Sequence, residues 1–157
     1  MKKYELTDDT ITVEGRTLHR IKALKSFSNV EEGELGGYVE KEDNLDQSGD
    51  AWVYGDARVY GNAQVSGDAW VYGDAWVYGD ARVSGENDYT TAKGFGREYR
   101  PTTFFRLKDG GIGVQCGCFY GTLDEFRAKV KETHKESKMG KEYLMLADLM
   151  EYKFKDA

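Results

Sequence analysis

The sequence predicts a mainly β protein, built around a short parallel β-helix and followed by a small mixed module. Three observations support this fold class. A six-residue pattern runs without interruption from Gly49 to Ser84. Two β-rich runs around a Gly-containing turn come before the pattern, and two amphipathic segments of helical period come after it.

The repeated stretch reads GDAWVY, GDARVY, GNAQVS, GDAWVY, GDAWVY and GDARVS. Ala and Val are two residues apart, so in an extended chain both point inward and the residue between them points outward. Three such units would complete a triangular turn, and the next three would stack on it about 4.8 Å away. The Gly-Asp pairs suit the corners, where Gly and Asx residues tolerate tight bends.

The pattern also extends upstream in a weaker form. Leu45 and Val39 continue the spacing of six from the Ala position. We therefore expect the β-helix to begin near Gly37, to span residues 37–88 and to make about three turns. A helix this short exposes both ends and needs a cap at each of them.

The flanking segments have the patterns of such caps. Residues 1–36 contain two short β-rich runs around Glu14-Gly15, which predict an N-terminal β-hairpin cap. Residues 89–157 predict a ββαα module, with strands over 102–108 and 112–119 and a last helix over about 141–152. Thr122 and Glu125 have the spacing of a capping box at the start of the first helix.

Charge is distributed unevenly along the 157 residues, whose net charge is -6. Residues 1–90 carry 9 Lys and Arg against 18 Asp and Glu, whereas residues 91–157 carry 13 against 10. The acidic half argues against a duplex nucleic acid along the repeats. No apolar run approaches the length of a membrane span and no signal-peptide pattern opens the sequence, so we expect a cytoplasmic protein without a membrane partner.

The repeats resemble hexapeptide-repeat proteins, which form left-handed parallel β-helices and are usually homotrimers. The opening KYELTDDTITVEGRTLHRIKAL, the repeats, and the tail TTFFRLKDG and VQCGCFYGTLDEFRAKVKETH together resemble a family of phage and prophage proteins described as polymer-forming. This resemblance implies a left-handed helix, a homotrimer or a dimer of trimers, and a setting in the cytoplasm of a bacterial host.

Catalysis and metal binding have little support in the sequence. Hexapeptide-repeat acyltransferases use a His as general base, but the repeats contain no His, and His19 and His134 lie in the flanks. Cys116 and Cys118 have no second Cys pair to complete a metal site, so we interpret them as reduced thiols. The corner carboxylates could bind calcium, although Asx turns explain them better. We expect no catalytic residue, no cofactor and no metal.

The outward positions of the repeats are rich in aromatic residues, which are enriched at protein interfaces. We predict that these residues form an oligomer or partner interface on the outside of the helix. They are Trp52, Trp70, Trp76, Tyr54, Tyr72, Tyr60 and Tyr78.

Basic residues concentrate between Lys93 and Lys108. Arg guanidinium groups suit phosphate oxygens, and aromatic rings stack on bases. We therefore predict a binding site for a small phosphorylated ligand, such as a cyclic nucleotide, formed by Arg97, Tyr99, Arg100, Arg106 and Lys108.

The resulting hypothesis is a non-enzymatic phage protein that counters host antiviral defence by sequestering a nucleotide signal. One alternative is direct blockade of a host defence protein. Another is a hexapeptide-repeat acyltransferase or a structural polymer-forming protein.

Overall fold

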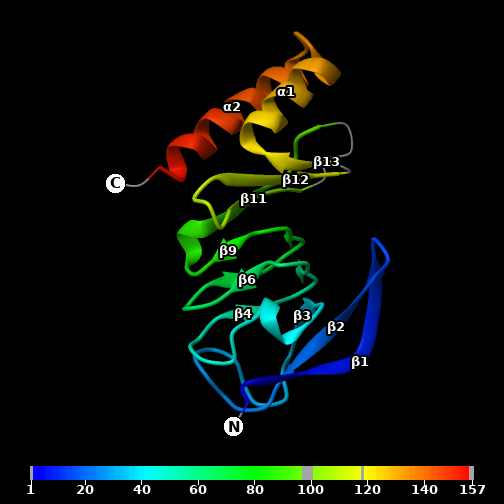
Figure 1. Ribbon diagram of the computed structural model, residues 1–157, viewed down its shortest axis with the longest axis vertical. Coiled ribbons are helices and arrows are strands. Elements are labelled where there is room, and N and C mark those ends of the chain that lie inside the picture. Colours follow the sequence, from blue (N-terminus) through cyan, green and yellow to red (C-terminus); the bar gives the residue numbers. More distant parts are fainter. Residues whose placement is uncertain (1, 97–100, 118, 156–157) are drawn as a thin grey trace. The chain divides into compact units, whose positions relative to one another are not determined.

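The computed structural model describes residues 2–96, 101–117 and 119–155 (Figure 1). The chain divides into two compact units, Met1–Glu86 and Asn87–Ala157. Each unit has its own core, and each is described separately below.

The six repeats form two-residue strands that stack in parallel. Each strand pairs with the one 18 residues later, so that Trp52 aligns with Trp70, Arg58 with Trp76 and Gln64 with Arg82. Figure 1 shows β6 and β9 as one such stacked pair. The Ala and Val side chains of all six repeats are buried, which confirms the inward assignment of both. The strands are β4 Trp52–Val53, β5 Arg58–Val59, β6 Gln64–Val65, β7 Trp70–Val71, β8 Trp76–Val77 and β9 Arg82–Val83.

The first turn of the helix has a different register from the one that the sequence predicts. Strand β3 (Leu35–Val39) pairs with β5 so that Val39 aligns with Val59, and Leu45 bridges Val65. Both pairs are 20 residues apart rather than 18. Val39 and Leu45 therefore occupy Val positions, and their assignment to Ala positions is wrong. The two extra residues lie between Leu45 and Val53, just after the short 3-10 helix η1 (Glu42–Asn44).

The predicted N-terminal hairpin is present. Strands β1 (Tyr4–Val13) and β2 (Arg16–Ala23) pair antiparallel, and Glu14 and Gly15 form the turn with positive φ. β2 then pairs antiparallel with β3, so that the hairpin and one face of the repeats form a single five-stranded sheet in the order β1-β2-β3-β5-β8. The hairpin thus covers part of the outer side of the repeats.

The second unit is an antiparallel sheet of four strands packed against two helices. The sheet has the order β10-β11-β12-β13, so the expected ββαα module is wrong in its number of strands. The sequence pattern does not indicate the short strand β10 (Tyr89–Ala92), which is mostly polar. The predicted run 112–119 is two strands, because Gly117 has a φ of 58° and the chain turns back there. The elements are η2 Glu86–Asp88, β10 Tyr89–Ala92, β11 Thr102–Arg106, β12 Ile112–Cys116, β13 Phe119–Thr122, α1 Leu123–His134 and α2 Lys138–Lys153.

The first helix of this unit begins as the sequence predicts. The Thr122 hydroxyl accepts a hydrogen bond from the Glu125 amide at 3.2 Å, and the Glu125 carboxylate accepts one from the Thr122 amide at 3.0 Å. This reciprocal capping box satisfies two amide groups at the helix start. The buried core lies between the sheet and the helices and includes Phe104, Val114, Phe126, Tyr143, Ala147 and Met150.

Candidate functional site

Trp52 is completely buried inside its own unit, although it occupies an outward position of the repeat. The rings of Tyr4 and Phe27 contact it edge to face, with centroids 6.2 and 5.3 Å away. The N-terminal segment therefore covers this tryptophan. The prediction that Trp52 is exposed for an interface between subunits is wrong.

The face formed by β3, β5 and β8 is covered in a similar way. Tyr60 is buried in a cluster with Val13, Leu18 and Tyr38, and Trp76 and Tyr78 pack against that cluster. Tyr60 and Tyr78 stack with their centroids 4.6 Å apart. The hairpin residues thus cover Tyr60, and the prediction that Tyr60 is exposed also needs correction.

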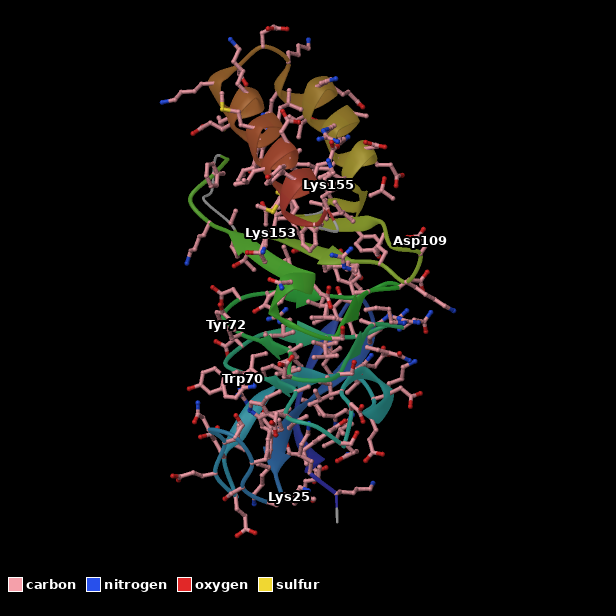
Figure 2. The ribbon with its side chains drawn as sticks, turned by 90° about the vertical axis from the view of Figure 1, so that its left-hand side faces the viewer. Lys25, Trp70, Tyr72, Asp109, Lys153 and Lys155 are labelled. Atoms are coloured by element: carbon pink, nitrogen blue, oxygen red, sulfur yellow. The ribbon has the colours of Figure 1, made fainter. Side chains whose placement is uncertain are left out.

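Beyond the covered Trp52, the face formed by β4 and β7 is open within the unit. Tyr54 and Tyr72 have 47% and 55% of their surface exposed, and Trp70, on the same turn as Tyr72, is half-buried. The rings of Tyr54 and Trp70 lie 6.4 Å apart at 32°. Figure 2 shows Trp70 and Tyr72 close together on one side of the coils. We call Tyr54, Trp70 and Tyr72 the aromatic face.

Carboxylates border the aromatic face at both corners. Asp50 and Asp68 precede its two strands, Asp56 and Asp74 follow them, and all four residues are exposed. The indole nitrogen of Trp70 donates a hydrogen bond to the backbone oxygen of Asp50 at 3.1 Å, which fixes the ring against the corner. The segments 50–56 and 68–74 contain no Lys or Arg. The face therefore combines exposed rings with negative charge.

The predicted phosphate site is only partly described. Arg97, Tyr99 and Arg100 lie outside the described residues. Arg106 donates to the Asp88 carboxylate at 2.9 Å and to the backbone oxygen of Phe154 at 3.2 Å, so its guanidinium is engaged within the second unit. Lys108 is exposed in the turn after β11.

A cavity of about 750 Å³ lies in the second unit between the β11–β12 turn, the start of α1 and the end of α2. Asp109 and Lys155, both labelled in Figure 2, lie at its wall. Three further carboxylates at the wall contact the guanidinium of Arg127, within 2.9–3.3 Å. They belong to Asp124, Asp148 and Glu151. Arg127 offsets one of these three negative charges, and its contacts with Asp148 and Glu151 hold α1 against α2.

The two histidines lie in structural surroundings. His19 Nδ1 is 3.0 Å from the backbone oxygen of Thr7 within the hairpin, and the ring of His134 lies 5.7 Å from that of Tyr143. Thr102 donates a hydrogen bond to the Cys116 sulfur at 3.2 Å. Burial raises the pKa of the Tyr143 hydroxyl, and the nearby Cys116 raises it further. Cys118 lies outside the described residues.

Within the described residues, no three His, Cys, Asp or Glu side chains are grouped so that they could hold a metal ion. In the same part of the chain, no helix has both the length and the apolar composition that crossing a bilayer requires.

The comparison with known families gives one result. A family model described as YdcK beta solenoid repeat matches residues 51–67 and 63–79. Both matches fall in the stacked repeats, and together they cover less than half of the chain. The repeat region is thus a β-solenoid, in agreement with the parallel stacking of its strands. No curated protein matches the chain.

Proposed function

We propose that this protein is a non-enzymatic binding protein and that it binds a protein partner through the aromatic face. One observation carries this proposal: Tyr54, Trp70 and Tyr72 remain exposed while the hairpin covers the aromatic residues of the neighbouring face. Large exposed rings on a rigid sheet are typical of surfaces that bind proteins, because their burial gains free energy with little loss of side-chain freedom.

The proposed setting is a phage or prophage protein that blocks a host defence protein in the bacterial cytoplasm. The resemblance of the opening segment, the repeats and the tail to phage proteins supports this setting. The repeats also support a left-handed solenoid of the hexapeptide type, since glycines at the corners alternate with two-residue strands. Blockade needs a stable surface rather than catalytic groups, which fits the structural surroundings of His19 and His134.

Sequestration of a phosphorylated nucleotide is the second candidate function. Lys108 of the second unit is exposed, and the aromatic face of the first unit offers a separate surface on which a base could stack. Two observations count against it relative to a protein partner. The carboxylates that border the aromatic face would repel phosphate, and Arg106 is engaged with Asp88.

The test is co-purification of the tagged protein from host bacteria, followed by mass spectrometry of retained proteins and small molecules. The comparison variant is Trp70→Gln/Tyr72→Ser, which places the residues of Gln64 and Ser66 at equivalent positions of the repeat. We expect one host protein to be retained by the wild type and lost by the variant. A retained nucleotide would favour sequestration, and turnover of any ligand would exclude a purely binding role.

We also propose that the protein acts as a homo-oligomer. Helix α2 presents an apolar stripe of Met145, Leu149 and Tyr152, which are 69%, 56% and 76% exposed and spaced four and three residues apart. This stripe is a surface for self-association that does not use the aromatic face. Light scattering of the wild type should give three or six times the 17.8 kDa of one chain. Met145→Glu/Leu149→Glu should give a smaller assembly, and a monomeric wild type would exclude the proposal.

A further inference from the structure

We propose that the aromatic face recognises an extended segment of the partner that carries Arg or Lys at alternate positions. This inference rests on the proposed function and specifies the chemistry of the partner. It draws on three features of the first unit: a cation–π contact on the neighbouring face, the charge around the aromatic face, and the spacing of its rings.

The neighbouring face of the solenoid already contains the contact that we propose. Arg58 lies in the outward position of β5, and its guanidinium stacks 4.7 Å from the ring centroid of Trp76 in the next turn. The same position on the neighbouring turn of the aromatic face belongs to Trp52, which points outward but is covered by Tyr4 and Phe27. Among the described residues, no Lys or Arg stacks on the ring of Trp70. A cation from another molecule would stack on the ring of Trp70 in β7, as Arg58 stacks on the ring of Trp76 in β8.

The charge of this unit complements such a partner. Residues 1–86 carry 9 Lys and Arg against 17 Asp and Glu. Asp50 and Asp68 are exposed on one border of the aromatic face and Asp56 on the other. Arg20 lies 3.6 Å from Asp56, and the Lys3 ammonium attracts Asp50, so each border is partly neutralised by one cation of the same unit. Carboxylates beside an aromatic ring attract a cation over distance, and the ring then holds it once both groups lose water.

The spacing of the rings suits an extended segment. Alternate side chains of a β-strand point the same way and are about 6.6 Å apart. The rings of Tyr54 and Trp70 are 6.4 Å apart. Two cationic side chains at positions i and i+2 would therefore reach the two rings together. In a helix, residues i and i+2 lie on different sides, and cations would have to stand at i and i+4 to reach both rings, so alternation is the pattern expected of an extended partner.

The test measures binding of short synthetic peptides to the full chain by calorimetry at low salt. The probe alternates Arg with Ser, a second peptide of equal charge groups its Arg residues in one block, and a third alternates Glu with Ser. We expect the alternating Arg peptide to bind the wild type about tenfold more tightly than the block peptide, and the Glu peptide not to bind.

Variants that keep the repeat pattern identify the site. Tyr54→Ser/Trp70→Gln/Tyr72→Ser uses residues that stand at the same positions in other repeats, at Ser66, Ser84 and Gln64. It should weaken binding about tenfold or more. Asp50→Asn/Asp68→Asn copies the corner residue Asn62 and should reduce both the affinity and its dependence on salt. The matched control Glu31→Gln/Glu32→Gln removes the same charge from an exposed loop and should leave the affinity within about twofold.

Four results would overturn the inference. Equal weakening by the two charge variants would indicate non-specific attraction, and failure of the wild type to bind the Arg peptide would exclude the proposed partner. A smaller assembly formed by the aromatic triple variant would make this face an interface between copies. In the fourth result, a host protein is retained only when the aromatic face is intact and yet is not displaced by any Arg peptide. That result would remove this inference and leave the proposed function intact. Binding of the Arg peptide without any retained host protein would support this inference and count against the proposed function.

Discussion

The ammonium nitrogen of Lys3 lies 2.6 Å from the backbone oxygen of Ala51, at a position where the lysine has no exposed surface. The backbone oxygens of Gly49 and Ser48 lie farther away, at 3.4 and 3.5 Å. The first residues of the chain are thereby attached to the corner that precedes β4. This attachment closes the lower end of the solenoid, where no further turn supplies hydrogen bonds.

Burial gives Lys3 a measurable effect on stability. Loss of water lowers the pKa of Lys3 from 10.5 to about 8, and the nearby Asp46 and Asp50 oppose only part of this shift. Between these two pH values the unfolded chain binds a proton that the folded chain does not bind. The free energy of unfolding should therefore increase with pH in this range, by at most about 1.4 kcal/mol per pH unit.

Urea denaturation between pH values of about 8 and 9.5 measures this effect. At higher pH the buried Tyr4 becomes important, because burial raises its pKa and the folded chain then loses stability as the pH rises. The control is Lys3→Met, which keeps an unbranched side chain and should give a flatter curve. An equal slope for both proteins would show that Lys3 does not titrate in this range.

Asn44 attaches the first turn of the solenoid to the second through hydrogen bonds of its side chain. Its side chain is fully buried, and it donates hydrogen bonds to the backbone oxygens of Gly61 at 3.1 Å and Ala63 at 2.9 Å. Its amide oxygen accepts from the amides of Glu40 and Lys41, at 3.1 and 3.0 Å. One side chain thus replaces the backbone pairing that a regular strand would have made.

We expect Asn44→Ala to lower the free energy of unfolding by about 2–4 kcal/mol, because four backbone groups lose their partner, one of them, the Ala63 oxygen, in a buried hydrogen bond. Asn44→Asp should be worse, since a carboxylate would face two backbone oxygens. Thermal denaturation of the two variants tests both statements. A variant Asn44→Ala that melts with the wild type would mean that water replaces the side chain.

The repeats show how far the sequence alone predicts the fold. Buried Ala and Val two residues apart predict the inward side of every strand, because an extended chain has a period of two. The same period of two gives no sign of the two-residue insertion after Leu45. Leu45 lies six residues before Ala51 and so fits an unbroken pattern, whereas the structure pairs it with Val65, at a distance of 20 residues. The apolar pattern cannot distinguish an Ala position from a Val position when both are buried.

The candidate site was predicted less completely for a different reason. The outward direction of Trp52 and Tyr60 follows from the repeat, but their burial depends on the hairpin and on Phe27, which lie more than twenty residues away along the chain. Periodicity describes one strand and does not specify which segment packs on its outer side. The open face of Tyr54, Trp70 and Tyr72 could be identified only after the covered positions were known.

Val65 provides a test of the inward assignment with a control beside it. The Val65 side chain is buried, and that of Gln64 is exposed on the opposite side of the same strand. Val65→Asp places an unpaired charge in the core and should lower the free energy of unfolding by about 4 kcal/mol or more. Gln64→Asp adds the same charge outside and should change little. Equal melting temperatures for the two variants would contradict the orientation of the repeat.

Arg106 distinguishes a structural role from the ligand-binding role that the sequence predicts. Its guanidinium binds the Asp88 carboxylate and the backbone oxygen of Phe154, which connects β11 to η2 and to the end of α2. We expect Arg106→Ala to lower the free energy of unfolding of the second unit by about 1.5–3 kcal/mol, the range for hydrogen bonds to charged groups. Lys108→Ala, two residues away in an exposed turn, should leave stability unchanged.

The partner variant Asp88→Asn makes this prediction specific. If Arg106 acts mainly through Asp88, the double variant Arg106→Ala/Asp88→Asn should be less destabilised than the sum of the two single variants, because both remove the same contact. Chemical denaturation of the four proteins gives this coupling energy directly. Strict additivity would show that the ion pair contributes little, and Arg106 would then again be a candidate for contact with a ligand.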